Sequence, residues 1–326
     1  MAPVLQRPNV LRMRYVVLLV ALIALHVPLR SEPAAPVLKK VGEAKLLTAR
    51  SGASVVLTDD AAYVIGGSNS IGPVGDIERI DLTTLTSKCV TEKITSRRHS
   101  AAARIGRKLY IVGGLGLTGR PVLPIDTVEI FDLDSGQVTK GHPLAYPRRG
   151  LGLAALDGKL YAIGGTQLRG HDRTQTNRVE VYDPATDTWT DGPTMPTPRE
   201  CEAVVVTGFI LVPGGYASRR STDVVELFVP GEQVWKRLPS LGVPTSAAAV
   251  AVAAGTVYLF GNYEDRAQVL GYDLRTRKTS RLKVDFKPVR HAAADALGSL
   301  IVVAGGSTSE SGPDLGEVQF YQVALP

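Results

Sequence analysis

The sequence predicts an all-β protein built from six copies of one repeat, and three observations carry this prediction. An apolar segment that ends in a glycine pair recurs along the chain, and each copy also holds a second apolar segment and a polar one. Apolar and polar residues alternate with period two in these segments, and turn residues bound them, which is typical of strands. The 326 residues can hold one large repeat-built domain.

The glycine pair marks the end of an apolar strand, and its first positions lie 45 to 51 residues apart when Phe260 is taken as the fifth. The six copies span residues 63–67, 110–114, 161–165, 210–215, 258–261 and 301–306. The fifth copy has Phe260-Gly261 where the others have two glycines, so this repeat departs most from the pattern.

The third repeat shows the rest of the unit best, because Tyr182-Asp-Pro and Trp189 follow its glycine pair. A diglycine after an apolar strand, then Tyr-Asp-Pro and Trp, at a period of about 50 residues, resembles the kelch repeat family. The resemblance covers residues 37–326 and implies a six-bladed kelch-type β-propeller with four-stranded blades around a channel. The last repeat lacks one strand, so residues 37–47 are expected to complete its blade and close the ring.

Residues 1–31 differ in character from the repeats. Arg7, Arg12 and Arg14 precede the apolar run 15–25, and Pro28 interrupts it. The run is shorter than the roughly 20 residues that span a bilayer core, so a signal peptide is favoured over a transmembrane helix. We therefore expect residues 1–31 to be a signal peptide or a retained membrane anchor. Residues 32–326 would then be a single exported propeller, either secreted or periplasmic.

The net charge of +6 arises mostly in that segment, which contains Arg7, Arg12, Arg14 and Arg30 and no acidic residue. Without it, Lys plus Arg falls from 37 to 33 against 31 Asp plus Glu, which leaves +2. A nearly neutral chain lacks the clustered basic face that nucleic acid requires. We expect a monomer with no nucleic-acid partner, which contacts a membrane only if residues 1–31 are uncleaved.

Arginine begins the first strand of five of the six repeats. In a propeller this strand lines the channel, so we expect these arginines to converge at one mouth and to bind carboxylate or sulfate groups. The ligand-binding candidates are Arg50, Arg97, Arg148, Arg199 and Arg290. The alternative is a framework role in ion pairs with glutamates of the third strands. The candidate partners for that role are Glu78, Glu129, Glu180 and Glu226.

The loops between second and third strands are expected on the same mouth. Loop 166–177 is the richest in hydrogen-bonding groups, so His171 is a further candidate ligand contact, although polarity is also ordinary for a solvated loop. Cytoplasmic kelch adaptors of ubiquitin ligases are similar at this face, where arginines hold acidic peptides. We therefore favour a binding propeller that recognises a partner protein, an acidic peptide or a glycan at an arginine-lined mouth.

Catalysis is the alternative function. Glu200 and Glu202 flank Cys201 at the start of the fourth repeat and share one strand face, so they are weak candidates for acid/base work. The chain is similar to the exported bacterial sialic acid epimerases in being exported and built from six kelch blades. That similarity implies a carbohydrate-active isomerase or mutarotase acting on an acidic sugar, with structural ion pairs as the alternative role for both glutamates.

No metal or cofactor is expected. The mature chain has only His99, His142, His171 and His291, which are too dispersed for a metal-ligand spacing. Galactose oxidase-type propellers resemble the chain in fold, but they need a Cys–Tyr cross-link, a second Tyr and two His around one site. Cys89 is placed on an outer strand and Cys201 on an inner strand across the ring, so no disulfide is expected between them.

Overall fold

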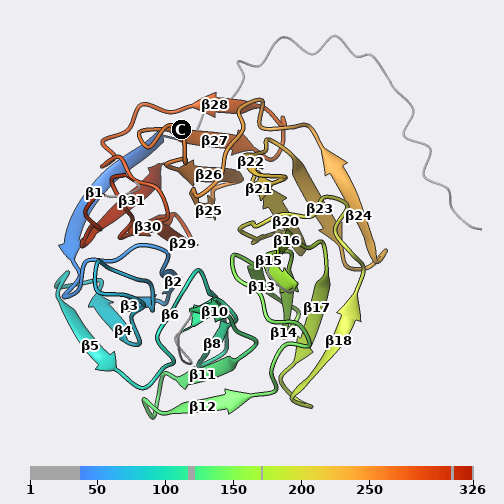
Figure 1. The fold of residues 1–326 in the computed structure, drawn as a ribbon. Coiled ribbons are helices and arrows are strands. Elements are labelled where there is room, and N and C mark those ends of the chain that lie inside the picture. The colour runs from blue at the N-terminus through green and yellow to red at the C-terminus, as the bar shows by residue number, and fades with distance from the viewer. Residues whose placement is uncertain (1–36, 117–121, 170–171, 310–311, 325–326) are drawn as a thin grey trace, which may run out of the picture. The chain divides into compact units, whose positions relative to one another are not determined.

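The fold is built from six antiparallel sheets of four strands each, which we number 1 to 6 along the chain. The computed structural model describes residues 37–116, 122–169, 172–309 and 312–324, and every regular element among them is a strand. Figure 1 shows the sheets arranged side by side in a ring. This is the arrangement of a β-propeller.

The strands of each sheet follow one another in the chain. Sheets 1 to 3 contain β2 (Ser54–Leu57), β3 (Ala61–Ile65), β4 (Ile77–Asp81) and β5 (Ser87–Thr91); β7 (Ala101–Ile105), β8 (Lys108–Val112), β11 (Val128–Asp132) and β12 (Val138–Gly141); β13 (Gly152–Leu156), β14 (Lys159–Ile163), β17 (Val179–Asp183) and β18 (Thr188–Gly192). Sheets 4 to 6 contain β19 (Val204–Val206), β20 (Phe209–Pro213), β23 (Val225–Val229) and β24 (Val234–Leu238); β25 (Ala249–Ala253), β26 (Thr256–Phe260), β27 (Val269–Asp273) and β28 (Thr279–Arg281); β29 (Ala293–Leu297), β30 (Leu300–Ala304), β31 (Glu317–Ala324) and β1 (Val37–Lys45).

Shorter strands lie in the loops between the second and third strands of the sheets. They are β9 (Leu115–Gly116), β10 (Leu123–Pro124), β15 (Thr166–Arg169), β16 (Asp172–Gln175), β21 (Tyr216–Ala217) and β22 (Arg220–Ser221). One more short strand, β6 (Arg97–Arg98), precedes the first strand of sheet 2 and pairs with β9. All of them lie on the face where the first strands begin, because neighbouring strands of a sheet alternate in direction.

Sheet 6 combines strands from the two ends of the described chain. β1 pairs antiparallel with β31, from Val37 opposite Ala324 to Lys45 opposite Glu317. β1 occupies the outer position that the sequence predicts for residues 37–47. Leu38 and Ala44 of β1 are buried against sheets 5 and 1, respectively.

The glycine pair is required where one sheet meets the next. Gly66 and Gly67 follow β3 with φ of 60° and 100°, which side chains other than glycine rarely adopt. A Cβ atom on Gly66 would also lie 2.8 Å from the carbonyl oxygen of Arg97 in sheet 2. A side chain at Gly66 would therefore clash with the next sheet, so this turn requires glycine.

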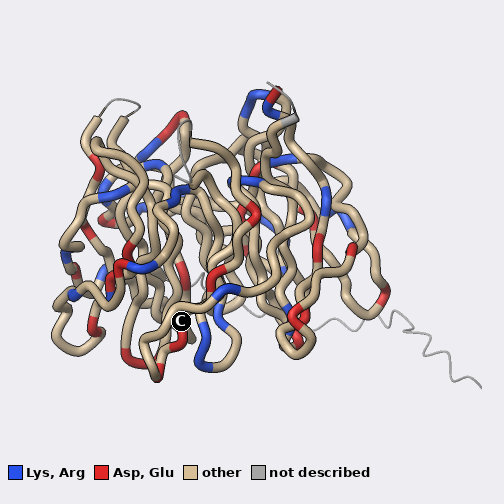
Figure 2. The backbone as a smooth tube through the Cα atoms, turned by 60° about the horizontal axis from the view of Figure 1, so that its bottom comes forward, with Lys and Arg blue, Asp and Glu red and all other residues tan. Residues whose placement is uncertain are grey.

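The core is divided into six hydrophobic clusters, and each cluster lies between two neighbouring sheets. The cluster between sheets 5 and 6, for example, packs Phe260 against Tyr321 with ring centroids 5.2 Å apart. Figure 2 shows charged residues of both signs distributed along the tube, many of them on the loops at its two faces. The stability of such a ring depends on every interface between neighbouring sheets.

Two further features bear on the sequence predictions. Cys89 and Cys201 are both free thiols. Within the described ranges, no helix has the length and apolar character needed to cross a membrane. The segment 1–31, on which the prediction of export depends, lies outside the described residues.

Candidate functional site

The structure places four of the predicted ligand-binding arginines inside the sheets and away from the mouth. Arg50, Arg97, Arg148 and Arg199 are all 0% exposed. Their ion pairs are Arg50–Glu78, Arg97–Glu129, Arg148–Glu180 and Arg199–Glu226, each between the segment that enters a sheet and the third strand of that sheet. The expected orientation toward the mouth is therefore wrong for these four residues, and the glutamates of the third strands are confirmed as their partners.

Backbone contacts explain why these arginines turn inward. Arg50 and Arg97 donate hydrogen bonds of 3.0 Å to the carbonyl oxygens of Gly66 and Gly113, at the ends of β3 and β8. Arg148 donates a bond of 3.1 Å to the carbonyl of Ala162 in the same part of sheet 3. Each guanidinium thus links the entry of its sheet to the second and third strands, which is a framework role.

Arg290 does not belong to this set. A Cβ atom on the first glycine of each pair would meet the carbonyl oxygen of the equivalent residue in the next sheet, and for Gly261 that residue is Val289. Arg290 therefore corresponds to Arg98 and Arg149, one residue later. Its guanidinium stacks over the ring of Tyr263 at 4.4 Å, and the residue is 7% exposed.

Sheets 5 and 6 lack both the arginine and the glutamate. Thr245 and Val289 replace the arginine. Leu270 and Gln319 take the glutamate position, as their pairing with Leu259 and Val303 shows. Gln319 keeps part of the role of the carboxylate, because its Oε1 accepts a 2.9 Å hydrogen bond from the Lys287 amide.

The residues two places after Arg50, Arg97, Arg148, Arg199, Thr245 and Val289 form an inner ring at the mouth. We call the six residues at this position the belt: Gly52, His99, Gly150, Cys201, Ala247 and His291. Five backbone hydrogen bonds of 2.7 to 3.0 Å join them from sheet to sheet: Gly52 to His291, His99 to Gly52, Gly150 to His99, Cys201 to Gly150, and His291 to Ala247, with the donor first.

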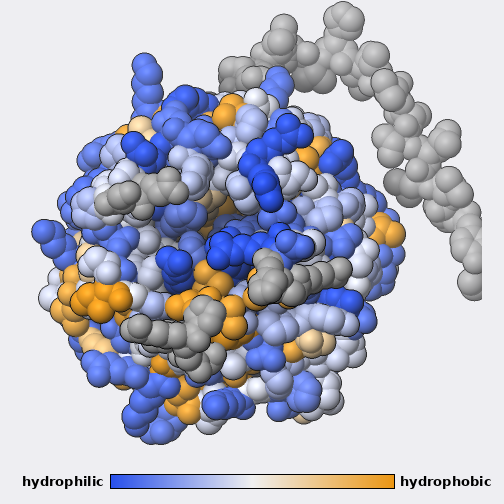
Figure 3. Space-filling view, viewed as in Figure 1, coloured by the Kyte–Doolittle hydropathy of each residue, from blue (hydrophilic) through white to orange (hydrophobic). Residues whose placement is uncertain are grey.

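A cavity of about 570 Å³ opens at the belt. Figure 3 shows a hollow near the centre of this face, with strongly hydrophilic side chains beside it and hydrophobic ones on one side. A second cavity of about 310 Å³ lies deeper in the channel and is lined by the inner strands of all six sheets. Glu202 and Val250 border both cavities, so the two are adjacent.

The arginines that do line the mouth are different from those the sequence singled out. They are Arg149, Arg173, Arg219 and Arg220. Arg98 lies beside them, and burial together with the positive charges of Arg149 and Arg173 lowers its pKa. Guanidinium groups stay protonated in proteins, so the mouth carries a cluster of like charges. The doublets Arg97-Arg98 and Arg148-Arg149 could have indicated these arginines from the sequence. Adjacent residues in an extended chain face opposite ways, so one arginine of each doublet faces the mouth when the other faces the sheet.

Both candidate catalytic glutamates line the mouth cavity, but their surroundings differ. Glu200 forms an ion pair of 2.9 Å with Arg149 and accepts a 2.6 Å hydrogen bond from the Thr166 hydroxyl. Glu202 has no hydrogen-bond or ion-pair partner among the described side chains. The Glu202 side chain is exposed to the channel, yet the protein around it desolvates the carboxyl group, and this desolvation raises its pKa to about 7.

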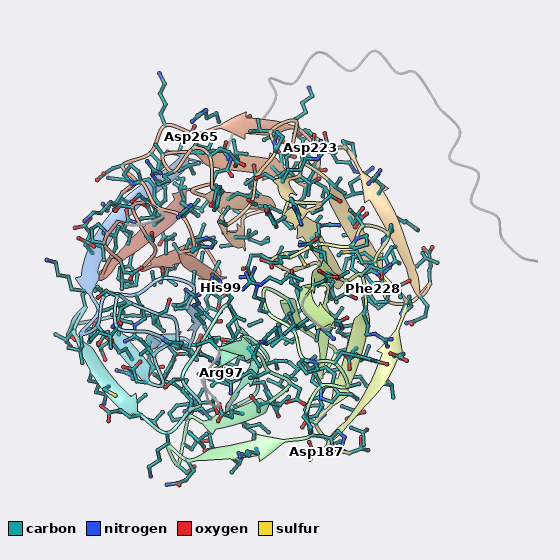
Figure 4. All side chains as sticks on the ribbon, viewed as in Figure 1. Arg97, His99, Asp187, Asp223, Phe228 and Asp265 are labelled. Carbon is teal, nitrogen blue, oxygen red and sulfur yellow. The ribbon has the colours of Figure 1, made fainter. Side chains whose placement is uncertain are left out.

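His99 and His291 meet at the mouth above Gly52, with ring centroids 5.1 Å apart. Figure 4 shows His99 at the centre of the ring, with Arg97 farther out in sheet 2. Burial lowers the pKa of both imidazoles, to about 4 for His291, and nearby arginines add to the effect. Both rings are therefore neutral near pH 7. The remaining candidate, His171, lies outside the described residues.

In the described part of the chain, no three His, Cys, Asp or Glu side chains lie close enough together to hold a metal ion. The site is thus a hollow with four lining arginines, two neutral imidazoles and one unpaired carboxyl, which suits the binding of an anionic group.

The ring of sheets, the glycine pairs and the central mouth define the class of protein, which is a kelch-type β-propeller. Residues 52–262 match the family model described as the KLHDC2/KLHL20/DRC7 Kelch-repeats domain. The match covers more than half of the chain, so the protein belongs to the kelch-repeat family.

Curated relatives are similar over part of their length. Kelch-like protein terF of Aspergillus terreus is 36% identical over 128 residues, which are 37% of this chain and 28% of that protein. Mouse Kelch-like protein 35 is 27% identical over 154 residues, or 47% of this chain and 25% of that protein. Human Kelch repeat and BTB domain-containing protein 12 is 28% identical over 180 residues, with coverages of 47% and 28%. The chain thus matches only about a quarter of the length of these relatives.

Proposed function

We propose that the protein binds the acidic group of a partner protein, peptide or glycan at the mouth of its channel. The observation that carries this proposal is the cluster formed by Arg98, Arg149 and Arg173 beside the cavity. Within the described residues, neither Arg98 nor Arg173 has a carboxylate in ion-pair contact, so both guanidinium groups are available to a ligand. Kelch-repeat domains are typically protein-interaction modules, which supports a binding role.

The geometry favours an anion for a physical reason. Like charges held together repel each other, and an anionic group placed among them relieves that repulsion. The partly enclosed cavity reduces screening by water and salt, so a carboxylate gains more there than on an open surface. Planar guanidinium groups also bind carboxylate or sulfate through paired hydrogen bonds.

Calorimetric titration of residues 32–326 tests the proposal, with a hexaglutamate peptide, glucuronate and neutral glucose as ligands. We expect at least one acidic ligand to bind and glucose to show no binding. The double variant Arg98→Gln/Arg149→Gln should weaken the acidic ligand at least about tenfold, since it removes two charged hydrogen-bond donors. Arg107→Gln is the matched control, because Arg107 lies in the exposed turn after β7 on the opposite face. Equal affinity in both variants would contradict the proposal.

Isomerisation of an acidic sugar is a second candidate function, and Glu202 is the observation that favours it. An unpaired carboxyl group with a pKa of about 7 suits proton transfer at neutral pH. Glu200 is less suited, because Arg149 and Thr166 occupy its oxygen atom Oε1. Exchange spectroscopy with glucuronate would show faster interconversion of its anomers in the presence of the protein and no acceleration by Glu202→Gln.

Two further proposals concern the ends of the chain. The six sheets act as the six blades of a ring that the pairing of β1 with β31 closes. Residues 1–31 direct export, on the evidence of the arginines and the short apolar run. Fusion of residues 1–36 to a reporter that is active only outside the cytoplasm tests export. A fusion in which the run 15–25 carries two aspartates is the control.

A further inference from the structure

One link of the belt is missing. Five belt residues have φ between 51° and 60°, but Cys201 does not adopt a positive φ. Its amide still donates to the carbonyl of Gly150 at 3.0 Å. No hydrogen bond, however, joins the Ala247 amide to the Cys201 carbonyl, although both residues are described. The belt is therefore open between sheets 4 and 5.

The sequence of sheet 4 explains this opening. In the other sheets, the residue before the glycine pair faces the residue two places after the belt, as Ile65 faces Ser54. In sheet 4 the pairing of Val204 with Leu211 shifts this register by one residue, and the pairing stops before it reaches Pro213. Proline has no N–H to donate to the ladder, so β19 begins only at Val204 and Cys201 precedes it in irregular backbone.

The opening is part of the mouth cavity. Cys201 and Ala247 both line it, and so do Pro213 and Leu259 from the second strands of sheets 4 and 5. The described lining includes no second-strand residue from the other four sheets. The cavity thus extends from the arginine cluster into the space between sheets 4 and 5, where the belt is open.

Other contacts keep the two sheets together at this point. The Gly215 amide donates to the carbonyl of Thr245 at 2.8 Å, and the Thr245 amide donates to Thr222 at 3.0 Å. The hydroxyl of Ser221 lies 2.8 Å from that of Ser246 and bonds the Glu264 carboxylate at 2.7 Å. These contacts keep sheets 4 and 5 together next to the missing belt hydrogen bond. The opening is therefore a defined gap in an otherwise connected interface.

We infer that this opening is a subsite for a ligand that carries a carboxylate and a neutral amide, and that the amide bridges Ala247 and Cys201. The inference rests on the proposed function, because the carboxylate is the group held by the arginine cluster. The Ala247 N–H needs an acceptor and the Cys201 carbonyl needs a donor. A single amide group supplies both, as a peptide group does in a strand ladder.

The chemistry of both groups supports a specific bridge. Neither the Ala247 amide nor the Cys201 carbonyl has a hydrogen-bond partner among the described residues, so both are available to a polar group of a ligand in the cavity. The five closed links show that the belt geometry permits N–H to carbonyl bonds of normal length. A bound amide would restore at this one position the pairing that the rest of the belt already has.

Three isosteric probes test the inference. Succinamate carries a carboxylate and an amide, levulinate replaces the amide NH2 by a methyl group, and 4-methylpentanoate also lacks the carbonyl oxygen. We expect succinamate to bind most tightly, levulinate at least about fivefold more weakly, and 4-methylpentanoate more weakly again, because each step leaves one belt group unpaired. Equal affinity of all three would overturn the subsite and leave the proposed anion site standing. Failure of all three to bind would overturn the subsite, whereas the anion site stands or falls separately by the titrations with hexaglutamate and glucuronate.

Selective isotope labelling locates the contact. Carbonyl-13C serine with 15N-alanine labels only two amide pairs, Ser246–Ala247 and the internal control Ser100–Ala101. Carbonyl-13C cysteine in uniformly 15N-labelled protein reports on Cys201 through Glu202, with Cys89 and Val90 as its control. Succinamate should shift the Ala247 and Cys201 signals and leave both controls unchanged, whereas 4-methylpentanoate should shift neither. Unmoved signals at saturating succinamate would place its amide elsewhere and overturn the inference.

Discussion

Arg148 and Glu180 form an ion pair inside sheet 3, and their side chains are 0% and 1% exposed. Equivalent pairs recur in sheets 1, 2 and 4, whereas sheets 5 and 6 lack both partners. The arginine and the glutamate are thus present or absent together within a single chain. This is expected if a buried charge is tolerated only beside its partner.

Removing one partner of this pair should therefore cost more than replacing both. Arg148→Val leaves Glu180 buried without its cation and should lower the free energy of unfolding by about 3–5 kcal/mol. The double variant Arg148→Val/Glu180→Gln reproduces the residues of sheet 6 and should recover much of that loss. Urea denaturation measures both. A double variant no more stable than Arg148→Val would contradict this account of the pair.

Two glycines with nearly the same φ should tolerate alanine differently. Gly66 and Gly106 have φ of 60° and 59°, so alanine suffers the same left-handed strain of about 1–2 kcal/mol at both positions. A Cβ at Gly66 would lie 2.8 Å from the Arg97 carbonyl, whereas nothing lies within 4 Å at Gly106. Thermal unfolding should show Gly66→Ala as clearly the less stable variant. Equal melting temperatures would mean that the contact between sheets 1 and 2 is not close at Gly66.

β1 contains a matched pair of positions that tests its packing in the ring. Leu38 is 8% exposed, whereas Val41 is 54% exposed. Leu38→Ala should cost about 2–3 kcal/mol through lost burial and the cavity it leaves, and Val41→Ala should change stability by less than about 0.5 kcal/mol. Denaturant titrations of the two variants measure the difference. Similar small losses in both would argue against β1 as an integral strand of sheet 6.

Glu202 should make the stability of the folded state depend on pH. Its pKa is about 7 when folded and near 4.5 when unfolded, so the folded state binds more protons between these values. The free energy of unfolding should therefore fall as pH rises from 4.5 to 7. The contribution should be about 1 kcal/mol, because water in the channel screens the charge.

The variant Glu202→Gln should lose this part of the pH dependence and exceed the wild-type stability at pH 8. Asp295 contributes with the same sign, since burial raises its pKa to about 6, so part of the slope should remain in the variant. Denaturant titrations from pH 5 to pH 8 measure the effect. An unchanged slope would show that the Glu202 carboxyl is ordinarily solvated.

The sequence by itself determined the repeat, the number of its copies and the family. Glycine pairs, strand alternation and turn residues are patterns of a few neighbouring residues, so they can be recognised in the sequence alone. The glutamate partner of each buried arginine could also be predicted from the sequence, because the glutamates recur at a constant place in the repeat. Glu200 and Glu202 likewise line one cavity, as predicted, although residues 201–203 form no strand and the expected shared strand face is absent.

Only the tertiary structure decided which arginine of each doublet faces a ligand. Arg97 and Arg98 are adjacent in the chain, yet the first is buried in sheet 2 and the second is exposed near the mouth. Which arginine faces the mouth depends on how the belt residues turn the backbone. The left-handed φ values of His99 and His291 cannot be predicted from the residue type. The open link between Cys201 and Ala247 was equally hidden, because it arises from a one-residue register shift between strands that Pro213 helps to impose.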